Sequence, residues 1–186
     1  MALERAAWLG REHGATVEWL PFDLHPEYPP EGIPREELHR RYPEDVHVRT
    51  REMVEVSGLV YNPPADVVPN SRKALEVTEL ARANGLHEEV HTRLMHAYWS
   101  EGQNIGDADT LLDLVADAGL DRDEAAEALA DRRFAERVDA STAEAQQAGI
   151  HAIPAFVLDR RVLLLGAQPH EIFERALEQV EGSSEP

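Results

Sequence analysis

The fold of this chain is decided by the stretch Gly149-Ile150-His151-Ala152-Ile153-Pro154-Ala155-Phe156-Val157-Leu158. Gly149 ends a helical pattern that begins near Phe134, because glycine readily adopts the left-handed conformation in which helices commonly stop. One apolar residue and a proline then stand directly before the apolar run Ala155–Leu158, which has the length of a buried strand. The stretch therefore predicts a helix, an X-Pro turn and a short strand in succession.

A second strand and a final helix are predicted after this stretch. The apolar run Val162–Leu165 predicts the strand, and Asp159-Arg160-Arg161 joins it to the first one. Gln168-Pro169 opens the helix, because proline is favourable at the first helical position, where the N–H that it lacks has no helical partner. The inward side of this helix is predicted to contain Ile172, Phe173, Leu177 and Val180.

The first part of the chain combines one helix, one strand and a proline-rich region. Residues 2–13 predict a helix, and the β-branched and aromatic residues of 16–22 predict a strand. Residues 21–69 contain nine of the twelve prolines, so this region is expected to be mainly irregular. Short helices are predicted near 35–41 and 46–57.

A series of helices is predicted after residue 70. Ser71, Asp107 and Asp121 are each predicted to cap the start of one, because their side chains can accept a hydrogen bond from a free N–H in the first turn. A further helix is predicted over 86–99. We see no internal repeat, so these helices are interpreted as one insertion between the outer parts of an α/β fold.

Composition limits the partners of this protein. Its 36 acidic residues outweigh 18 basic ones, and the resulting formal charge of −18 repels nucleic acid and anionic membranes. No apolar run approaches the roughly 20 residues that span a bilayer, and the first residues lack the apolar segment of a secretory signal. We therefore expect an acidic cytoplasmic protein without nucleic-acid or membrane partners. The sequence contains no cysteine, which excludes disulfides, thiolate metal sites and thiol nucleophiles.

Several segments that follow one another over nearly the whole chain carry a family pattern. They are Trp19-Leu20-Pro21-Phe22-Asp23-Leu24-His25-Pro26, Pro69-Asn70-Ser71, Ala97-Tyr98-Trp99, Asn104-Ile105-Gly106-Asp107, Ile153-Pro154-Ala155-Phe156-Val157 and Gly166-Ala167-Gln168-Pro169. With them the chain resembles the DsbA family, and within it the FrnE-like branch that is related to 2-hydroxychromene-2-carboxylate isomerases and kappa-class glutathione transferases. The resemblance implies an α/β protein with a thioredoxin-like fold. Residues 1–186 would form a single domain with a helical insertion at about 60–135.

The chain departs from the family at its start. Members of the family begin with a strand and then carry a Cys-x-x-Cys at the start of the first helix, whereas residues 1–6 here resemble the part of that helix just past the second cysteine. We therefore expect the N-terminal strand to be missing, and we expect Met1 to be internal to a longer reading frame or the chain to be trimmed. Catalytic residues of the redox kind are absent.

The resemblance also implies where a ligand would bind. Pro154 would follow a cis peptide bond, so that the backbone of Ile153 is exposed and pairs with an extended peptide or a glutathione-like thiol. The loop Gly166-Ala167-Gln168 would hold a carboxylate with the free N–H groups at the start of the last helix. An ordinary proline and a plain helix cap are the alternatives for these two segments.

One further motif indicates a different chemistry. His87-Glu88-Glu89-Val90-His91 matches HExxH, in which two histidines on one helix face bind zinc and the glutamate acts as a base. However, Glu89 places a charge where that motif carries uncharged residues, and Leu94 and Ala97 occupy the positions of the missing glycine and third ligand. We therefore predict no metal site.

Two functions are compatible with these residues. The first is a thiol–disulfide oxidoreductase or isomerase homologue that is redox-incompetent because it has no cysteine. The second is a non-redox module that binds a peptide or glutathione, or a glutathione-dependent isomerase in which the cofactor provides the sulfur. In each case the partner is a disulfide- or thiol-containing protein or small molecule. No resident cofactor is expected, and glutathione is the candidate ligand.

Overall fold

The computed structural model describes residues 2–166 and 168–182, which fall into two compact units. The first unit consists of Met1–Leu20 and Ala143–Pro186, and the second consists of Pro21–Thr142. Each unit is described by itself below, and the organisation of the chain as a single domain stays a prediction.

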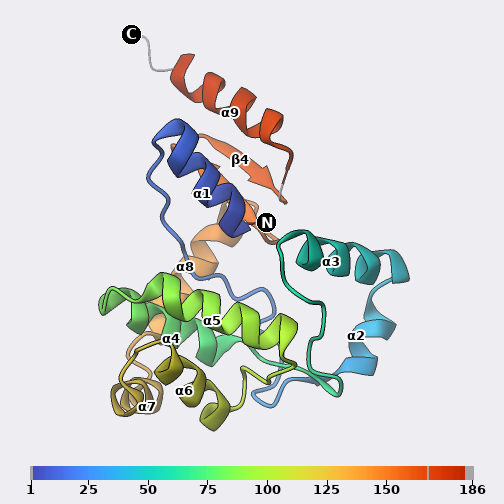
Figure 1. The fold of residues 1–186 in the computed structure, drawn as a ribbon, viewed down its shortest axis with the longest axis vertical. Helices are drawn as coiled ribbons and strands as arrows, with labels where there is room; N and C mark the ends of the chain where they lie inside the picture. Colours follow the sequence, from blue (N-terminus) through green and yellow to red (C-terminus); the bar gives the residue numbers. More distant parts are fainter. Residues whose placement is uncertain (1, 167, 183–186) are drawn as a thin grey trace. The chain divides into compact units, whose positions relative to one another are not determined.

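The first unit contains a two-stranded sheet and two helices. Its elements are α1 (Ala2–His13), β3 (Ala155–Leu158), β4 (Val162–Leu165) and α9 (His170–Gly182), together with the end of α8 (Ala135–Gln147). Strands β3 and β4 pair in antiparallel fashion, with Ala155 opposite Leu165 and Leu158 opposite Val162. Figure 1 shows α1 and α9 alongside this hairpin. The predictions of a helix over 2–13, of both strands and of the last helix are confirmed.

The core of the first unit lies on one face of the hairpin. Trp8 and Leu9 from α1 and Phe173 from α9 are buried, and Phe156 and Leu164 pack against them. Phe156 stands opposite Leu164 in the ladder, so these two side chains share the covered face. Side chains alternate between the two faces of a strand, and the neighbours of this pair therefore point to the opposite side.

The second unit is mainly helical. Its elements are β1 (Ile33–Pro34), α2 (Arg35–Arg41), α3 (Glu44–Val56), β2 (Val67–Val68), α4 (Arg72–Ala83), α5 (His87–Ser100), α6 (Ala108–Asp117), α7 (Arg122–Asp131) and most of α8. Helices α4 to α7 enclose the larger core, to which Val77, Val90, Leu111, Val115 and Ala125 contribute fully buried side chains. Figure 1 shows these helices as one packed group. The helices predicted near 35–41 and 46–57 and after residue 70 are thus present.

The helix caps agree with the sequence at two of three positions. Asp107 accepts a hydrogen bond from the Thr110 N–H, and Asp121 accepts one from the Glu124 N–H. The predicted cap at Ser71 is wrong, because its side chain makes no capping hydrogen bond. Asn70 Oδ1 accepts the hydrogen bond from Arg72 N instead, at 2.8 Å, since an asparagine can turn the chain by binding the backbone two residues further on.

The strand predicted over 16–22 is wrong. These residues are irregular in the structure. A strand needs a neighbour for its backbone groups, and no described strand pairs with this segment. The β-branched and aromatic residues of this segment favour a strand, but propensity alone does not form one. Val17 and Leu20 are exposed.

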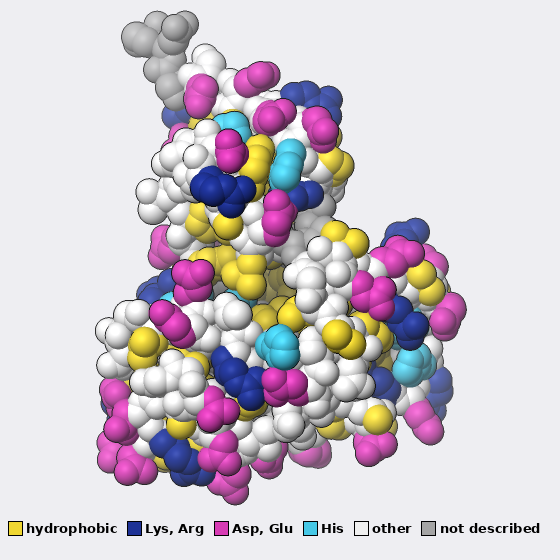
Figure 2. All heavy atoms as spheres, in the orientation of Figure 1, with side chains coloured by type: hydrophobic (Ala, Val, Ile, Leu, Met, Phe, Trp, Pro, Cys, Tyr) yellow, Lys and Arg dark blue, Asp and Glu magenta, His cyan; other side chains and the backbone are white. Residues whose placement is uncertain are grey.

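Two surface properties bear on the expected partners. In the described part of the chain, every helix is too short or too polar to span a bilayer. Acidic side chains are spread widely over the face seen in Figure 2, in keeping with the formal charge of −18. The acidic character expected from composition is therefore a property of the folded surface.

Candidate functional site

The Ile153–Pro154 peptide bond is cis, as the family resemblance implies. It lies directly before β3, and Ile153 is exposed. The Pro154 carbonyl oxygen accepts a hydrogen bond from Gly166 N at 2.7 Å. This bond continues the β3–β4 ladder by one pair and places Gly166 beside the proline loop. The structure thus brings together Ile153, Pro154 and Gly166, which the sequence analysis proposed as parts of one site.

The ladder leaves one edge of β3 open. Hydrogen-bonded and non-hydrogen-bonded pairs alternate in an antiparallel ladder, so the bond between Pro154 and Gly166 directs the backbone groups of Phe156 toward β4. The N–H and C=O groups of Ala155 and Val157 then point away from β4. They form no backbone hydrogen bond with another residue in the described part of the chain. An extended peptide could therefore pair with them.

An apolar surface adjoins this open edge. On the face of the hairpin that α1 and α9 do not cover, Val157 is 52% exposed, Leu163 37% and Leu165 43%, and Ile153 before the strand is 53% exposed. Contiguous apolar side chains in contact with water are typical of interaction sites. An added strand would therefore meet free backbone groups and an apolar face at the same place.

The loop before α9 is closed by its own polar groups. Gly166 has a φ of 76°, in the left-handed region that favours glycine. Gln168 N donates to the Gly166 carbonyl at 3.0 Å, and Gln168 Nε2 donates to the Leu165 carbonyl at 2.6 Å. Ala167, which the sequence analysis also proposed for the site, lies outside the described residues. These bonds agree with the alternative of a plain cap, and a carboxylate-binding role stays a prediction.

Arg5 of α1 belongs to a cluster that holds this loop and that no sequence pattern indicated. Arg5 Nε donates to the Gln168 carbonyl at 2.8 Å, and Arg5 Nη1 lies 2.7 Å from His170 Nε2. The His170 ring stacks on Trp8, with ring centroids 4.2 Å apart and planes 11° from parallel. More than 160 residues separate Arg5 from its two partners, so no local pattern could have indicated this contact.

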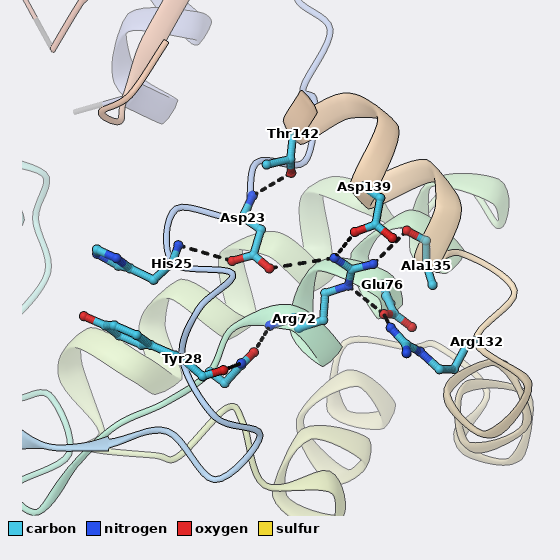
Figure 3. Close-up of polar contacts among 10 residues, drawn as sticks. Asp23, His25, Tyr28, Arg72, Glu76, Arg132, Ala135, Asp139 and Thr142 are labelled. Atoms are coloured by element: carbon cyan, nitrogen blue, oxygen red, sulfur yellow. Dashed lines mark hydrogen bonds and ion pairs between the residues drawn. The ribbon is translucent and has the colours of Figure 1, made fainter. Parts of the chain in front are cut away.

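A second polar cluster lies within the other unit (Figure 3). Arg72, the first residue of α4, donates to Glu76 at 2.8 Å, to Asp139 at 2.5 Å and to the Ala135 carbonyl at 2.8 Å. Glu76 is buried and also accepts a hydrogen bond from Arg132 at 3.2 Å. The two arginines therefore neutralise carboxylates between α4 and α8, and the cluster is interpreted as a structural clamp.

Asp23 connects the proline-rich segment to this clamp. Its N–H donates to Thr142 Oγ1 at 3.0 Å, and its carboxylate lies 3.8 Å from Arg72 Nη1 (Figure 3). Its Oδ1 also accepts the His25 N–H at 3.3 Å. Burial raises the pKa of Asp23 above its usual value even though the His25 N–H and Arg72 act to lower it.

The HExxH segment lies on α5. The rings of His87 and His91 stack with centroids 5.8 Å apart, and burial lowers the pKa of His91 to about 4, with a further contribution from His87. No group of three or more histidine, aspartate or glutamate residues is placed to hold a metal ion among the residues that the structure describes. The two histidines therefore lack a third protein ligand there, which a zinc site needs.

Three features define a thioredoxin-like α/β protein. They are the cis-proline loop, the hairpin with two helices on one face, and a helical region that lies between α1 and the hairpin in the sequence. The profile of the DSBA-like thioredoxin domain matches residues 2–178, and the chain belongs to this family. It is similar to the uncharacterized protein YwbO of Bacillus subtilis (strain 168), with 31% identity over 163 residues, which covers 87% of this chain and 80% of YwbO.

Two solved structures share the fold. The crystal structure of a probable DsbA oxidoreductase from Streptomyces coelicolor has a TM-score of 0.83 and 27% identity, and the match covers 99% of this chain and 83% of that one. A 2-hydroxychromene-2-carboxylate isomerase has a TM-score of 0.72 over 96% of this chain and 88% of its own, at 20% identity. The thioredoxin-like fold is thereby confirmed. In the described part of the chain the β3–β4 sheet has no third strand.

Proposed function

We propose that this protein is a FrnE-like homologue of thiol–disulfide oxidoreductases that binds a thiol- or disulfide-containing polypeptide along the open edge of β3. The observation that carries this proposal is the pair of outward-directed backbone units, Ala155 and Val157, beside an exposed apolar face. Main-chain hydrogen bonds would provide affinity, and the apolar face would select alternate side chains of the peptide. We place this activity in the cytoplasm.

The site residues have distinct roles in this proposal. Ile153 and Pro154 border the start of the open edge, Gly166 and Gln168 belong to the neighbouring loop, and Ala167 stays a proposed contact. Binding by this chain is non-covalent, because thiol–disulfide exchange requires an attacking thiolate and the sequence contains no cysteine. The bound partner therefore contributes every sulfur atom at the site.

A second candidate ligand is glutathione. Its support is the position of Gly166 and Gln168 directly before α9, because the N-terminus of a helix attracts a carboxylate. In that case the thiol of glutathione, held next to Pro154, would provide the sulfur for an isomerase reaction. The acidic character of the chain acts against this candidate, because glutathione is itself an anion.

Amide chemical shifts distinguish these ligands. The ¹⁵N-labelled protein is titrated with a short extended peptide that carries one cysteine, with the same peptide carrying serine, and with glutathione. If a peptide strand adds to β3, both peptides should shift the amides of Ala155 and Val157 more than those of Phe156 and Leu158, which face β4. If glutathione shifts the amides of Gly166 and Gln168 and the peptides do not, the second candidate is favoured. Shifts confined to the second unit, or none, would contradict both.

Proline variants provide a matched control. Val157→Pro removes an N–H from the open edge of β3, whereas Leu163→Pro removes one from the outer edge of β4. Proline is tolerated on an edge strand when its nitrogen faces away from the ladder, so both variants are expected to fold. Val157→Pro should weaken peptide binding more than Leu163→Pro, because Leu163 contributes only its side chain to the apolar face, whereas Val157 contributes both a side chain and a backbone N–H. Equal affinities for the two variants would argue against strand addition at β3.

A further inference from the structure

One nitrogen of His170 has two competing partners. His170 Nε2 lies 2.7 Å from Arg5 Nη1 and 3.3 Å from Glu4 Oε1, and Glu4 is also paired with Arg5. A guanidinium has donors only, so the short contact requires Nε2 to accept.

A proton on Nε2 reverses this arrangement. An imidazolium cannot accept from Arg5, and two cations at this separation repel each other, whereas the new N–H can donate to Glu4. We propose that His170 is a proton-operated switch, in which protonation exchanges Arg5 for Glu4 as its partner and loosens the loop before α9.

The contacts of Arg5 connect this switch to the loop. Arg5 is held by α1 and only 15% of its side chain is exposed, so a displaced guanidinium has little room to move without losing its bond to the Gln168 carbonyl. Gln168 N is bonded to the Gly166 carbonyl, and Gly166 N is bonded to the Pro154 carbonyl. An unbroken series of hydrogen bonds thus runs from His170 to the proline that borders the proposed site.

The surroundings of His170 favour this exchange over a rotation of the ring. Stacking on Trp8, which is buried, fixes the plane of the imidazole. Besides Glu4 and Arg5, the titratable groups nearby are His13, whose ring also contacts Trp8 with centroids 4.7 Å apart, and the helix neighbours of His170, Glu171 and Glu174. Of these described groups, only Glu4 and Arg5 are within ion-pair or hydrogen-bond distance of Nε2.

Backbone amide shifts test the switch without any ligand. The amides of Gly166 and Gln168 are followed from about pH 8 to about pH 5, the range in which histidine ordinarily titrates. The wild type should show one shared single-proton titration curve at both amides. His170→Gln should abolish it, because a glutamine oxygen can still accept from Arg5 but does not titrate in this range. His13→Gln, the matched control, should retain it.

Two results would overturn the switch: flat amide shifts in the wild type, or an unchanged curve in His170→Gln. Its effect on binding rests on the proposed function, and there we expect peptide affinity to be about fivefold weaker at the lower pH, at the lower end of ordinary couplings between sites. If the amides titrate as expected and no peptide binds at either pH, the proposed function fails while the switch is supported.

Discussion

Arg72 Nη1 and Asp139 Oδ1 are 2.5 Å apart, although 67 residues separate them along the chain. This ion pair joins the first residue of α4 to the middle of α8. The same guanidinium also reaches the buried carboxylates of Glu76 and Asp23. Arg72 is therefore the residue on which the polar contacts among these segments converge, and its removal leaves buried negative charge behind.

We expect Arg72→Leu to lower the free energy of unfolding by about 3 kcal/mol, the usual effect of removing one partner from a buried ion pair. Urea denaturation measures this change. Asp139→Asn is the control, because Asp139 is 66% exposed and asparagine still accepts a hydrogen bond, so its effect should stay below about 1 kcal/mol. Equal losses in the two variants would show that Arg72 is not central to the clamp.

Asp23 should make stability depend on pH. Burial raises the pKa of this carboxyl in the folded protein above its unfolded value, so the folded state binds the proton more tightly. Its contribution to stability is therefore fully present below the unfolded pKa of about 3.9 and is lost as the pH rises through the folded pKa. Asp23→Asn should melt at a higher temperature than the wild type at about pH 7, with the difference vanishing near pH 4. A difference that is constant across this range would contradict the assignment.

The turn between β3 and β4 carries removable strain. Asp159 and Arg160 have φ values of 47° and 57°, and Arg161 N donates to the Leu158 carbonyl at 3.0 Å. Glycine adopts positive φ without the steric penalty of a side chain, so Arg160→Gly should raise the free energy of unfolding by about 1 kcal/mol. Arg161→Gly, at a position with ordinary φ, should not. Thermal melting of both variants decides between these outcomes.

The chain should not catalyse disulfide reduction. Because the sequence contains no cysteine, we expect insulin precipitation in dithiothreitol to proceed at the rate of dithiothreitol alone, whatever amount of protein is added. A rate that rises in proportion to protein concentration would mean that catalysis proceeds without a protein thiol, and the non-covalent role proposed above would have to be abandoned.

Local patterns predicted the elements better than their contacts. The caps at Asp107 and Asp121 and the two strands of the hairpin depend on neighbouring residues, and they were predicted correctly. The cap at Ser71 failed because Asn70 competes for the same role one residue earlier. The strand over 16–22 failed because propensity cannot provide a pairing partner.

The contacts of the candidate site show the same difference between what local patterns predict and what tertiary packing decides. Ile153, Pro154 and Gly166 meet because a hairpin ladder brings its two ends together, and the sequence shows both strands. Arg5 and His170, which are 165 positions apart in the sequence, meet only after α1 and α9 have packed on the same face of the sheet. A contact of that kind depends on tertiary packing, and the spacing of residues along the chain does not predict it.

The open edge of β3 also governs how the molecules behave toward one another in concentrated solution. An unpaired apolar strand is a template on which further copies can stack, and a net charge of −18 on every copy opposes their approach. Salt shortens the reach of that repulsion, from about 10 Å at 0.1 M to about 3 Å at 1 M. We therefore expect added salt to favour association of copies along this strand.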